Sequence, residues 1–379
     1  KDNKNNQPLA SDVVYHGLYD SEPDICTANF FGHFLTFIKD PKTKKIKILN
    51  KGYEAGGYKI TQVVNGFQII SPNGDTFLFA LKGTTVTPVE GGIRPMSSNT
   101  WYLTKIITKL KKEINFSYTN HGEFNNSKSV VQLWRDVRPS ETTTFIPREK
   151  RIVLDKIFFP HGEIQFLTSS RDDVLGGRKL DQIILKNNWN EIVKTTKFNY
   201  DYFVSQNSTS DTVLWKNTLE KRLKLTEIEI NDQKFLFAYN IGDLPSKSSY
   251  AVDFFGNFNG ALSNTTSVPN ATRLVGNTLC GSCSTVPSNG TNNSSNIEYA
   301  KIGVLSKIIY PTGGYTTFDY ELNEFDNYIL PDYYSTSNTI THGNGLRVKE
   351  LKYYENASHL TKKTVYEYSG GKQLLPIYN

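Results

Sequence analysis

The chain has 379 residues, a formal net charge of +6 and an aromatic-rich composition, with 22 tyrosines and 22 phenylalanines but one methionine. Aromatic and β-branched residues favour pleated, half-buried strands, so this composition predicts an all-β protein and argues against long helices. The modest charge, without an aromatic–basic signature, disfavours a nucleic-acid partner, and no apolar run is long enough for a membrane-spanning helix.

The first predicted elements are two hairpins within an N-terminal region, residues 1–100. Apolar residues at 34–38 lead through a lysine-rich turn into a returning segment at 46–49. A second pair of segments, 67–70 and 76–79, is joined by a turn of proline, asparagine and glycine. Alternating apolar residues on either side of such turns indicate antiparallel hairpins.

A repeated hairpin becomes explicit in residues 101–240 and again in residues 301–379. Its outgoing arm reads Leu-x-Lys-Ile or close to it, and its returning arm carries apolar, mostly aromatic, residues at every second position. Residues two apart point to the same face of a strand, so we expect an extended array of antiparallel hairpins with one packed face and one largely wet face. The outgoing arms are 103–106, 154–157, 180–183, 225–228, 305–308 and, more loosely, 346–349. The returning arms carry Ile114, Phe116 and Tyr118; Phe235, Phe237 and Tyr239; Thr316, Phe318 and Tyr320; and Thr364, Tyr366 and Tyr368.

Three turns of the chain share a Pro-x-Gly pattern. Proline holds φ at about −65° in the second turn position, and glycine tolerates the positive φ that follows. A type I turn followed by a left-handed glycine closes a hairpin with a bulge, so we expect each glycine in that position. The turn-defining residues are Pro72 and Gly74, Pro160 and Gly162, and Pro311 and Gly313.

Two insertions, residues 134–151 and residues 241–300, interrupt the repeat, and we expect surface excursions there. The second is rich in serine, asparagine and glycine and contains Cys280 and Cys283. A local disulfide in an exported protein is the favoured hypothesis for this pair, with free thiols and a metal site as alternatives. A structural zinc site needs a second ligand pair, and none has matching spacing, so we expect no metal and no cofactor.

The sequence shows little that indicates catalysis. It has no Gly-x-Ser-x-Gly nucleophile elbow, and we interpret His161 as a solvated turn residue and His33 as a half-buried strand residue. We therefore expect no enzymatic activity, and an unrecognised hydrolase stays an open alternative. A second functional hypothesis is a carbohydrate- or protein-binding adhesin, because aromatic rings can either fill an interior or stack on a ligand. The candidate stacking residues are Trp101, Trp134, Trp189 and Trp215.

Several blocks of residues, taken together, carry a family resemblance. The most specific is the run Tyr310-Pro-Thr-Gly-Gly314, and Lys197-Phe-Asn-Tyr-Asp-Tyr202 looks like a degenerate Tyr-Asp element. Over nearly its whole length the chain resembles the large RHS/YD-repeat-like surface proteins of Bacteroidetes. The remaining matching blocks are 23–25 with 29–32, 101–106, 252–260, 303–309, and 345–349 leading to 366–368.

The resemblance implies long strips of antiparallel hairpins that wind into a hollow shell. In relatives such a shell encloses a C-terminal toxin or acts as a surface interaction module. The repeats here are irregular, and neither the autoproteolytic region nor a toxin domain is visible in the sequence. The polar start and the uncapped end lead us to expect an internal segment of a larger exported protein, outside the cell or on its surface. The expected partners are the remainder of the parent polypeptide, an encapsulated C-terminal domain, and other surface or secretion proteins.

Overall fold

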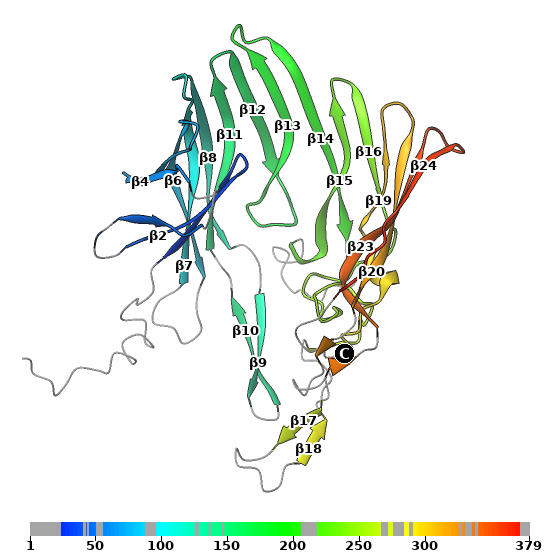
Figure 1. The fold of residues 1–379 in the computed structure, drawn as a ribbon. Helices are drawn as coiled ribbons and strands as arrows, with labels where there is room; N and C mark the ends of the chain where they lie inside the picture. Colours follow the sequence, from blue (N-terminus) through cyan, green and yellow to red (C-terminus); the bar gives the residue numbers. More distant parts are fainter. Residues whose placement is uncertain are drawn as a thin grey trace, which may run out of the picture. The chain divides into compact units, whose positions relative to one another are not determined.

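Figure 1 shows the fold in a computed structural model, which describes most of the chain from residue 24 to residue 371. The chain forms two compact units, and each is treated by itself. The first unit comprises Lys1–Ser127, Phe145–Leu167 and Ile183–Lys194, and the second comprises Lys128–Thr144, Thr168–Gln182 and Thr195–Asn379. Outside the described residues lie 1–23, 41–42, 44, 51–55, 88–95, 126–128, 136–137, 146–147, 206–217, 267–271, 276–283, 288–290, 326–327, 330–335, 338–339 and 372–379.

The predicted all-β class is confirmed, because the described residues form a 15-stranded sheet in which successive hairpins follow one another. The two hairpins predicted in the N-terminal region are present, and each of the predicted outgoing arms lies within a strand. In sheet order the strands are β4 (Lys59–Val63), β5 (Gly66–Ile70), β6 (Thr76–Thr87), β7 (Met96–Ile107), β8 (Glu113–Asn125), β11 (Arg148–Phe159), β12 (Gly162–Ser170), β13 (Arg178–Asn187), β14 (Ile192–Val204), β15 (Lys221–Ile230), β16 (Gln233–Tyr239), β19 (Leu305–Ile309), β20 (Tyr315–Phe325), β23 (Thr341–Tyr354) and β24 (Leu360–Val365).

Smaller sheets accompany this large one. One has three strands, β1 (Ile25–Phe30), β2 (His33–Lys39) and β3 (Ile46–Ile48). The others are the pairs β9 (Ser129–Arg135) with β10 (Arg138–Phe145), β17 (Thr272–Val275) with β18 (Ser284–Pro287), and β21 (Tyr328–Ile329) with β22 (Thr336–Ser337). A single turn of helix, α3, spans Ile297–Ala300. Within the described segments, no helix has the length and apolar character needed to cross a lipid bilayer.

The tightest apolar core lies in the first unit, where β1 and β2 pack on strands of the large sheet. Leu35 is completely buried and Ile69 is 1% exposed. The Phe30 and Phe77 rings lie 4.7 Å apart between centroids. Full burial of a side chain of this size stabilises a fold by about 1.5–3 kcal/mol. In the second unit the buried apolar residues among the described ones are Ala251 and Phe325, which is 6% exposed, so hydrogen bonds carry more of the specificity there.

One turn recurs at the tips of several described hairpins. The carbonyl of its first residue accepts from the N–H of the fourth, and the N–H of the first donates to the carbonyl of the fifth. The fourth residue has a positive φ, as predicted for Gly74 (φ 90°) and Gly313 (φ 85°). Lys111 (φ 63°) and Asn190 (φ 65°) occupy the same position without glycine's freedom. The turns of this type are residues 71–75, 108–112, 187–191 and 310–314.

Gly162 has the predicted positive φ (154°), but the turn before it is not the predicted type. Phe159 pairs directly with Gly162, so the hairpin closes through the two residues Pro160 and His161, and Gly162 is already the first residue of β12. A Cβ atom at Gly162 would lie 2.0 Å from the carbonyl oxygen of Lys186 in β13. Glycine is therefore required there because a neighbouring backbone approaches closely, which a local turn pattern does not reveal.

A hydrogen bond from a tyrosine hydroxyl repeats along the hairpins. Within one hairpin, a tyrosine of the returning arm donates to the backbone carbonyl of the first residue of the outgoing arm. The donor–acceptor distances are 2.7 Å for Tyr118 to Leu103, 2.9 Å for Tyr200 to Leu180, 2.7 Å for Tyr239 to Leu225, 2.7 Å for Tyr320 to Leu305 and 2.6 Å for Tyr368 to Val348. Burial raises the pKa of the first four tyrosines, so their hydroxyls remain protonated donors at neutral pH.

The next hairpin meets these tyrosines across a β-bulge. Tyr320 stands opposite Val348, whereas the preceding Asp319 stands opposite Glu350, so Lys349 is the extra residue. In other outgoing arms the leucine likewise stands opposite the tyrosine and the second residue is the extra one: Leu154 opposite Tyr118, Leu225 opposite Tyr200 and Leu305 opposite Tyr239, with Asp155, Thr226 and Ser306 left over.

The bulge also corrects the register of the last outgoing arm. By its pairing with Tyr320, Val348 takes the position that leucine has in the other arms, so the arm is residues 348–351 and not 346–349. Leu346 and Val348 are two apart and share one face of β23. Alternation alone could therefore not distinguish the two registers, and the partner strand decides between them.

Candidate functional site

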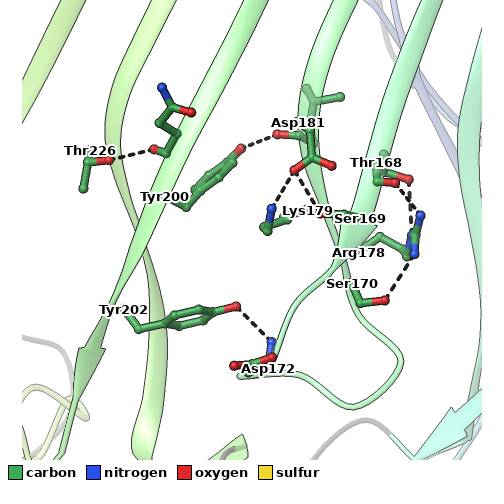
Figure 2. Close-up of polar contacts among 12 residues, drawn as sticks. Thr168, Ser169, Ser170, Asp172, Arg178, Lys179, Asp181, Tyr200, Tyr202 and Thr226 are labelled. Carbon is green, nitrogen blue, oxygen red and sulfur yellow. Dashed lines mark hydrogen bonds and ion pairs between the residues drawn. The ribbon is translucent and has the colours of Figure 1, made fainter.

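Figure 2 shows polar contacts at the point where the tyrosine pattern is interrupted. The register of the β11–β12 hairpin places Thr168 at the position that corresponds to Tyr118 in the β7–β8 hairpin. Arg178 of β13 occupies this place with its guanidinium, which donates from Nε to Thr168 Oγ1 at 3.2 Å and also to the Thr168 carbonyl. A third bond reaches Ser170 Oγ at 3.3 Å. At the place where other hairpins have a tyrosine, an arginine from the following strand thus bonds to Thr168 and Ser170 of the returning arm.

A buried carboxylate lies in the loop between β12 and β13. The Asp173 side chain is 3% exposed and accepts from Arg171 Nε at 2.7 Å and from Arg171 Nη2 at 2.6 Å. It also accepts from the Leu223 N–H at 3.0 Å, and Lys247 Nζ lies 4.0 Å from Oδ2. Burial by itself would raise the pKa of Asp173, but the bonds from Arg171 and Leu223 and the positive charges outweigh it, so the pKa is lowered. Asp173 is therefore a fixed, ionised anchor.

Positive charge surrounds this anchor. Arg222 is half-buried, and burial lowers its pKa. Its guanidinium donates to Ser205 Oγ at 3.0 Å, and that hydroxyl donates to the Pro245 carbonyl at 2.7 Å. The pKa of Lys247 is likewise lowered by burial, while Asp173 opposes that shift. These contacts link the β12–β13 loop, the start of β15 and the segment around residue 245, which is a structural role.

The same loop is held from outside by exposed groups. The Asp172 N–H donates to the Tyr202 hydroxyl at 2.9 Å, as Figure 2 shows. Its carboxylate forms an ion pair with Lys221 at 2.7 Å. Lys221 also lies 5.3 Å from the centre of the Tyr202 ring. Tyr202 belongs to the segment that resembles a degenerate Tyr-Asp element, and its neighbour Tyr200 makes the recurring hydroxyl bond.

A second buried carboxylate organises the start of the 241–300 insertion. Asp253 is 3% exposed, and its Oδ1 accepts from the N–H groups of Phe255 at 3.0 Å and Asn257 at 2.8 Å. The Ser295 hydroxyl donates to Oδ2 at 2.6 Å. A loop built around one saturated carboxylate needs little apolar core, because its own backbone donors are satisfied internally.

The described part of the 241–300 insertion is held by further side-chain contacts. Asn259, 6% exposed, donates from Nδ2 to the carbonyls of Asn292 at 2.8 Å and Ser294 at 3.2 Å. The second insertion also includes the strands β17 (Thr272–Val275) and β18 (Ser284–Pro287), which pair with each other, and the first insertion overlaps the β9–β10 pair. In these described contacts, side-chain amides and carboxylates bond to backbone groups. Residue composition alone does not predict such bonds.

The four candidate stacking tryptophans have different environments. Trp101 is half-buried and packs edge-to-face on Phe67, with ring centroids 4.9 Å apart and Lys82 Nζ 5.9 Å from its ring. Trp189, by contrast, is 76% exposed at the tip of the β13–β14 hairpin. The backbone of Trp134 lies in β9 but its side chain is outside the described part, as is all of Trp215. Trp189 is therefore the described tryptophan that is available to a ligand.

Cysteine and histidine residues add no reactive cluster to the described chain. Cys280 and Cys283 lie outside the described residues, so their disulfide stays a prediction. Cys26 is free, and burial together with the charge of Asp24 raises the pKa of its thiol. His33 is half-buried as predicted, with Nδ1 2.6 Å from the Tyr58 hydroxyl, and His161 is exposed in its turn. The described residues contain no group of three or more histidine, cysteine, aspartate or glutamate side chains arranged to hold a metal ion.

A shallow hollow lies between two hairpin tips of the first unit. Its volume is about 310 Å³, and its lining includes Phe158 and Glu163 from the β11–β12 hairpin. The other side is formed by Asn187, Asn188 and Asn190, which belong to the same turn as Trp189. Sequence reasoning selected Trp189, which follows the lining residue Asn188, but none of the residues that line the hollow, because no linear pattern shows that these two tips are neighbours.

A scan against models of protein families finds no match for this chain, and none of the curated proteins compared with it matches. The geometry of the described residues is therefore the basis for the functional proposal.

Proposed function

We propose that this chain is a non-catalytic scaffold, a segment of shell-like sheet within a large exported RHS/YD-repeat-like bacterial protein. The observation that carries the proposal is the repeated pair of devices on successive hairpins: a tyrosine hydroxyl bonded to an outgoing-arm carbonyl, and a bulge that meets the next hairpin. Contacts of this kind, repeated on most of the hairpins, favour a structure that extends a sheet unit by unit, as in other repeat proteins.

The state of the buried carboxylates supports a structural role. A general acid or base needs a pKa near the working pH and access to a substrate proton. Asp173 instead has a lowered pKa and is held by Arg171 and Leu223, and Asp253 accepts from two backbone N–H groups and a hydroxyl. Both carboxylates stabilise loops, and their oxygens are already engaged.

The free side of β24 supports a partner that continues the sheet. In the described sheet β24 pairs with β23 alone. The Tyr366 N–H donates inward to the Lys349 carbonyl at 3.0 Å, so the N–H of Val365, one residue earlier, points to the outer edge. Exposed strand edges template pairing with another strand. In this proposal the edge receives the next strand of the parent polypeptide, and the sheet encloses or displays a C-terminal domain or another surface protein.

The oligomeric state of the purified chain tests this proposal. We expect self-association that grows with concentration, because a free edge pairs with whatever strand is available, and light scattering after size exclusion measures it. Val365→Pro removes the outward N–H, which makes no bond to β23, so the substitution should reduce the association and leave the β23–β24 pairing intact. Val365→Thr keeps this N–H and should not reduce the association. A chain that stays monomeric at every concentration would contradict the proposal.

A further inference from the structure

The hollow between the β11–β12 and β13–β14 tips combines aromatic and polar groups in one place. The two tips belong to one unit and approach closely, since a Cβ atom on Gly162 would lie 3.1 Å from the Asn187 Cα. Phe158 lines the hollow and is 41% exposed. Trp189, 76% exposed, follows the lining residue Asn188 directly. Both rings are therefore open to solvent.

The polar lining has unused hydrogen-bonding capacity. Among the described residues, the side-chain amides of Asn188 and Asn190 have no hydrogen-bond partner. Glu163 receives Gln165 Nε2 at 2.5 Å and faces Lys186 Nζ at 3.8 Å, both through Oε1. Its Oε2 is therefore open to a further donor. An amide offers both a donor and an acceptor, and a carboxylate oxygen offers acceptors only.

The turn that carries these amides is held in one shape. Asn187 Oδ1 accepts from the N–H groups of Trp189 at 3.0 Å and Glu191 at 2.9 Å. Asn187 Nδ2 donates to the Glu191 carboxylate at 2.8 Å. The Asn190 N–H closes the turn on the Asn187 carbonyl at 3.0 Å. A surface that is ordered before a ligand arrives loses less conformational entropy on binding.

We propose that this hollow binds a neutral saccharide. A sugar ring has an apolar C–H face, which stacks on an aromatic ring, and adjacent hydroxyls, which each need a donor and an acceptor. In this proposal the ring of Trp189, which is next to the lining residue Asn188, supplies the stacking face, and the amides of Asn188 and Asn190 with Glu163 Oε2 bond the hydroxyls. Lys186 offsets the charge of Glu163, which favours a neutral ligand over an ion. The volume is at the lower end of the range of about 300–1,000 Å³ for small-molecule sites, which suits a short stretch of a glycan.

Titration calorimetry of the full chain with cellohexaose, xylohexaose, chitohexaose and maltohexaose tests the proposal. We expect saturable binding of at least one of the four. Trp189→Ala and Asn188→Ala should each weaken it, Trp189→Ala by about tenfold or more. The matched control is Leu110→Ala, because Leu110 is 72% exposed and occupies the same position in a turn of the same type. This control should bind like the unmodified chain.

Three results would each overturn the saccharide site. They are no saturable heat with any of the four hexasaccharides, unchanged affinity in Trp189→Ala, or an equal loss of affinity in Leu110→Ala. Thermal denaturation of each variant separates lost binding from lost folding, since an exposed side chain should leave the melting temperature unchanged. The outcome is independent of the self-association of β24, so failure of one proposal leaves the other standing.

Discussion

The Tyr320 hydroxyl donates to the Leu305 carbonyl at 2.7 Å, while the Tyr320 backbone stands opposite Val348 of the next hairpin. Tyr320 thus stabilises its own hairpin and also lies opposite the bulge in the first strand of the next hairpin. A bulge increases the local twist of a sheet. Tyrosines at four other hairpins form the same bond. The bond therefore helps to fix the pairing register of neighbouring strands, although the hairpins are unevenly spaced along the chain.

Removal of the Tyr320 hydroxyl should lower stability modestly. Tyr320→Phe keeps the ring and removes the donor, so we expect a loss of about 0.5–1.5 kcal/mol in the free energy of unfolding, measured in urea. Tyr366→Phe is the control, since Tyr366 is 40% exposed and its hydroxyl has no partner among the described residues. Equal losses in both variants would show that the Leu305 bond contributes nothing specific.

Gly313→Val should strain the hairpin tip. Gly313 has φ 85°, and no atom lies within 4 Å of the place a Cβ would take, so the cost comes from the backbone and not from a clash. We expect a loss of about 1–3 kcal/mol, measured by thermal denaturation. Thr312→Val, one residue earlier in the same turn, introduces the same side chain without a positive φ and should be nearly neutral. A neutral Gly313→Val would refute the left-handed assignment.

Lys111→Gly should stabilise the chain. Lys111 takes φ 63° in the same turn position as Gly313, and a side chain in the left-handed region costs about 1–2 kcal/mol. Glycine loses more conformational entropy on folding than lysine, which offsets part of the relieved strain. We therefore expect a net gain of about 0.5–1 kcal/mol in the free energy of unfolding, measured in urea. Lys109→Gly in the same turn has no such strain to relieve and should destabilise. A loss in Lys111→Gly would contradict the strain argument.

Asp173→Asn should be the most harmful of these substitutions. Loss of the carboxylate leaves Arg171 half-buried without its ion pair, and breaking such a pair costs about 3–5 kcal/mol. The neighbouring Asp172→Asn is the control: its side chain is 54% exposed, and its pair with Lys221 is worth at most about 1 kcal/mol. Similar losses in urea unfolding for both variants would argue against a buried anchor.

The Asp173 anchor also predicts a dependence on acid. Its folded pKa lies below the value of about 3.9 that an aspartate has in an unfolded chain. Stabilisation by the anchor is therefore fully present above that value and is lost as the pH falls through the folded pKa. Urea unfolding across a series of acidic pH values should show a decline that is smaller in Asp173→Asn. An identical slope in the two proteins would contradict the lowered pKa.

Asp253→Ala should loosen the loop at the start of the 241–300 insertion. The substitution leaves the N–H groups of Phe255 and Asn257 without their acceptor, at a cost of about 1–3 kcal/mol. Limited proteolysis should then cut residues 250–264 faster than in the unmodified chain. Asp243→Ala, at an exposed position of the same insertion, should leave the cleavage rate unchanged. If both variants are cut equally fast, Asp253 does not organise the loop.

Much of the fold could be predicted from local patterns. The Pro-Asn-Gly and Pro-Thr-Gly turns identified Gly74 and Gly313 because a positive φ is a property of a few adjacent residues. The pattern failed for Gly162, where the requirement comes from the Lys186 carbonyl in another hairpin. It also overlooked Lys111 and Asn190, because hydrogen bonds of the closed hairpin impose the left-handed conformation on them.

The candidate site was less predictable. Trp189 was selected for its residue type, but Glu163 and the Trp189 neighbour Asn188 line one hollow only because two hairpins adjoin at their tips. Trp101 was selected by the same criterion, and it packs on Phe67 instead. Residue type indicates what a side chain can do, and burial decides whether it is available.

The sequence by itself determined the all-β class, the turns at Gly74 and Gly313 and the shared face of each arm, since alternation and backbone φ preferences act over a few residues. Only the tertiary structure decided which residue of an arm forms the bulge, where Asp173 finds its cations and which tips enclose a hollow. The physical reason is that pairing register, desolvation and close approach depend on groups far apart in the chain, and each is set by the partner that a residue meets.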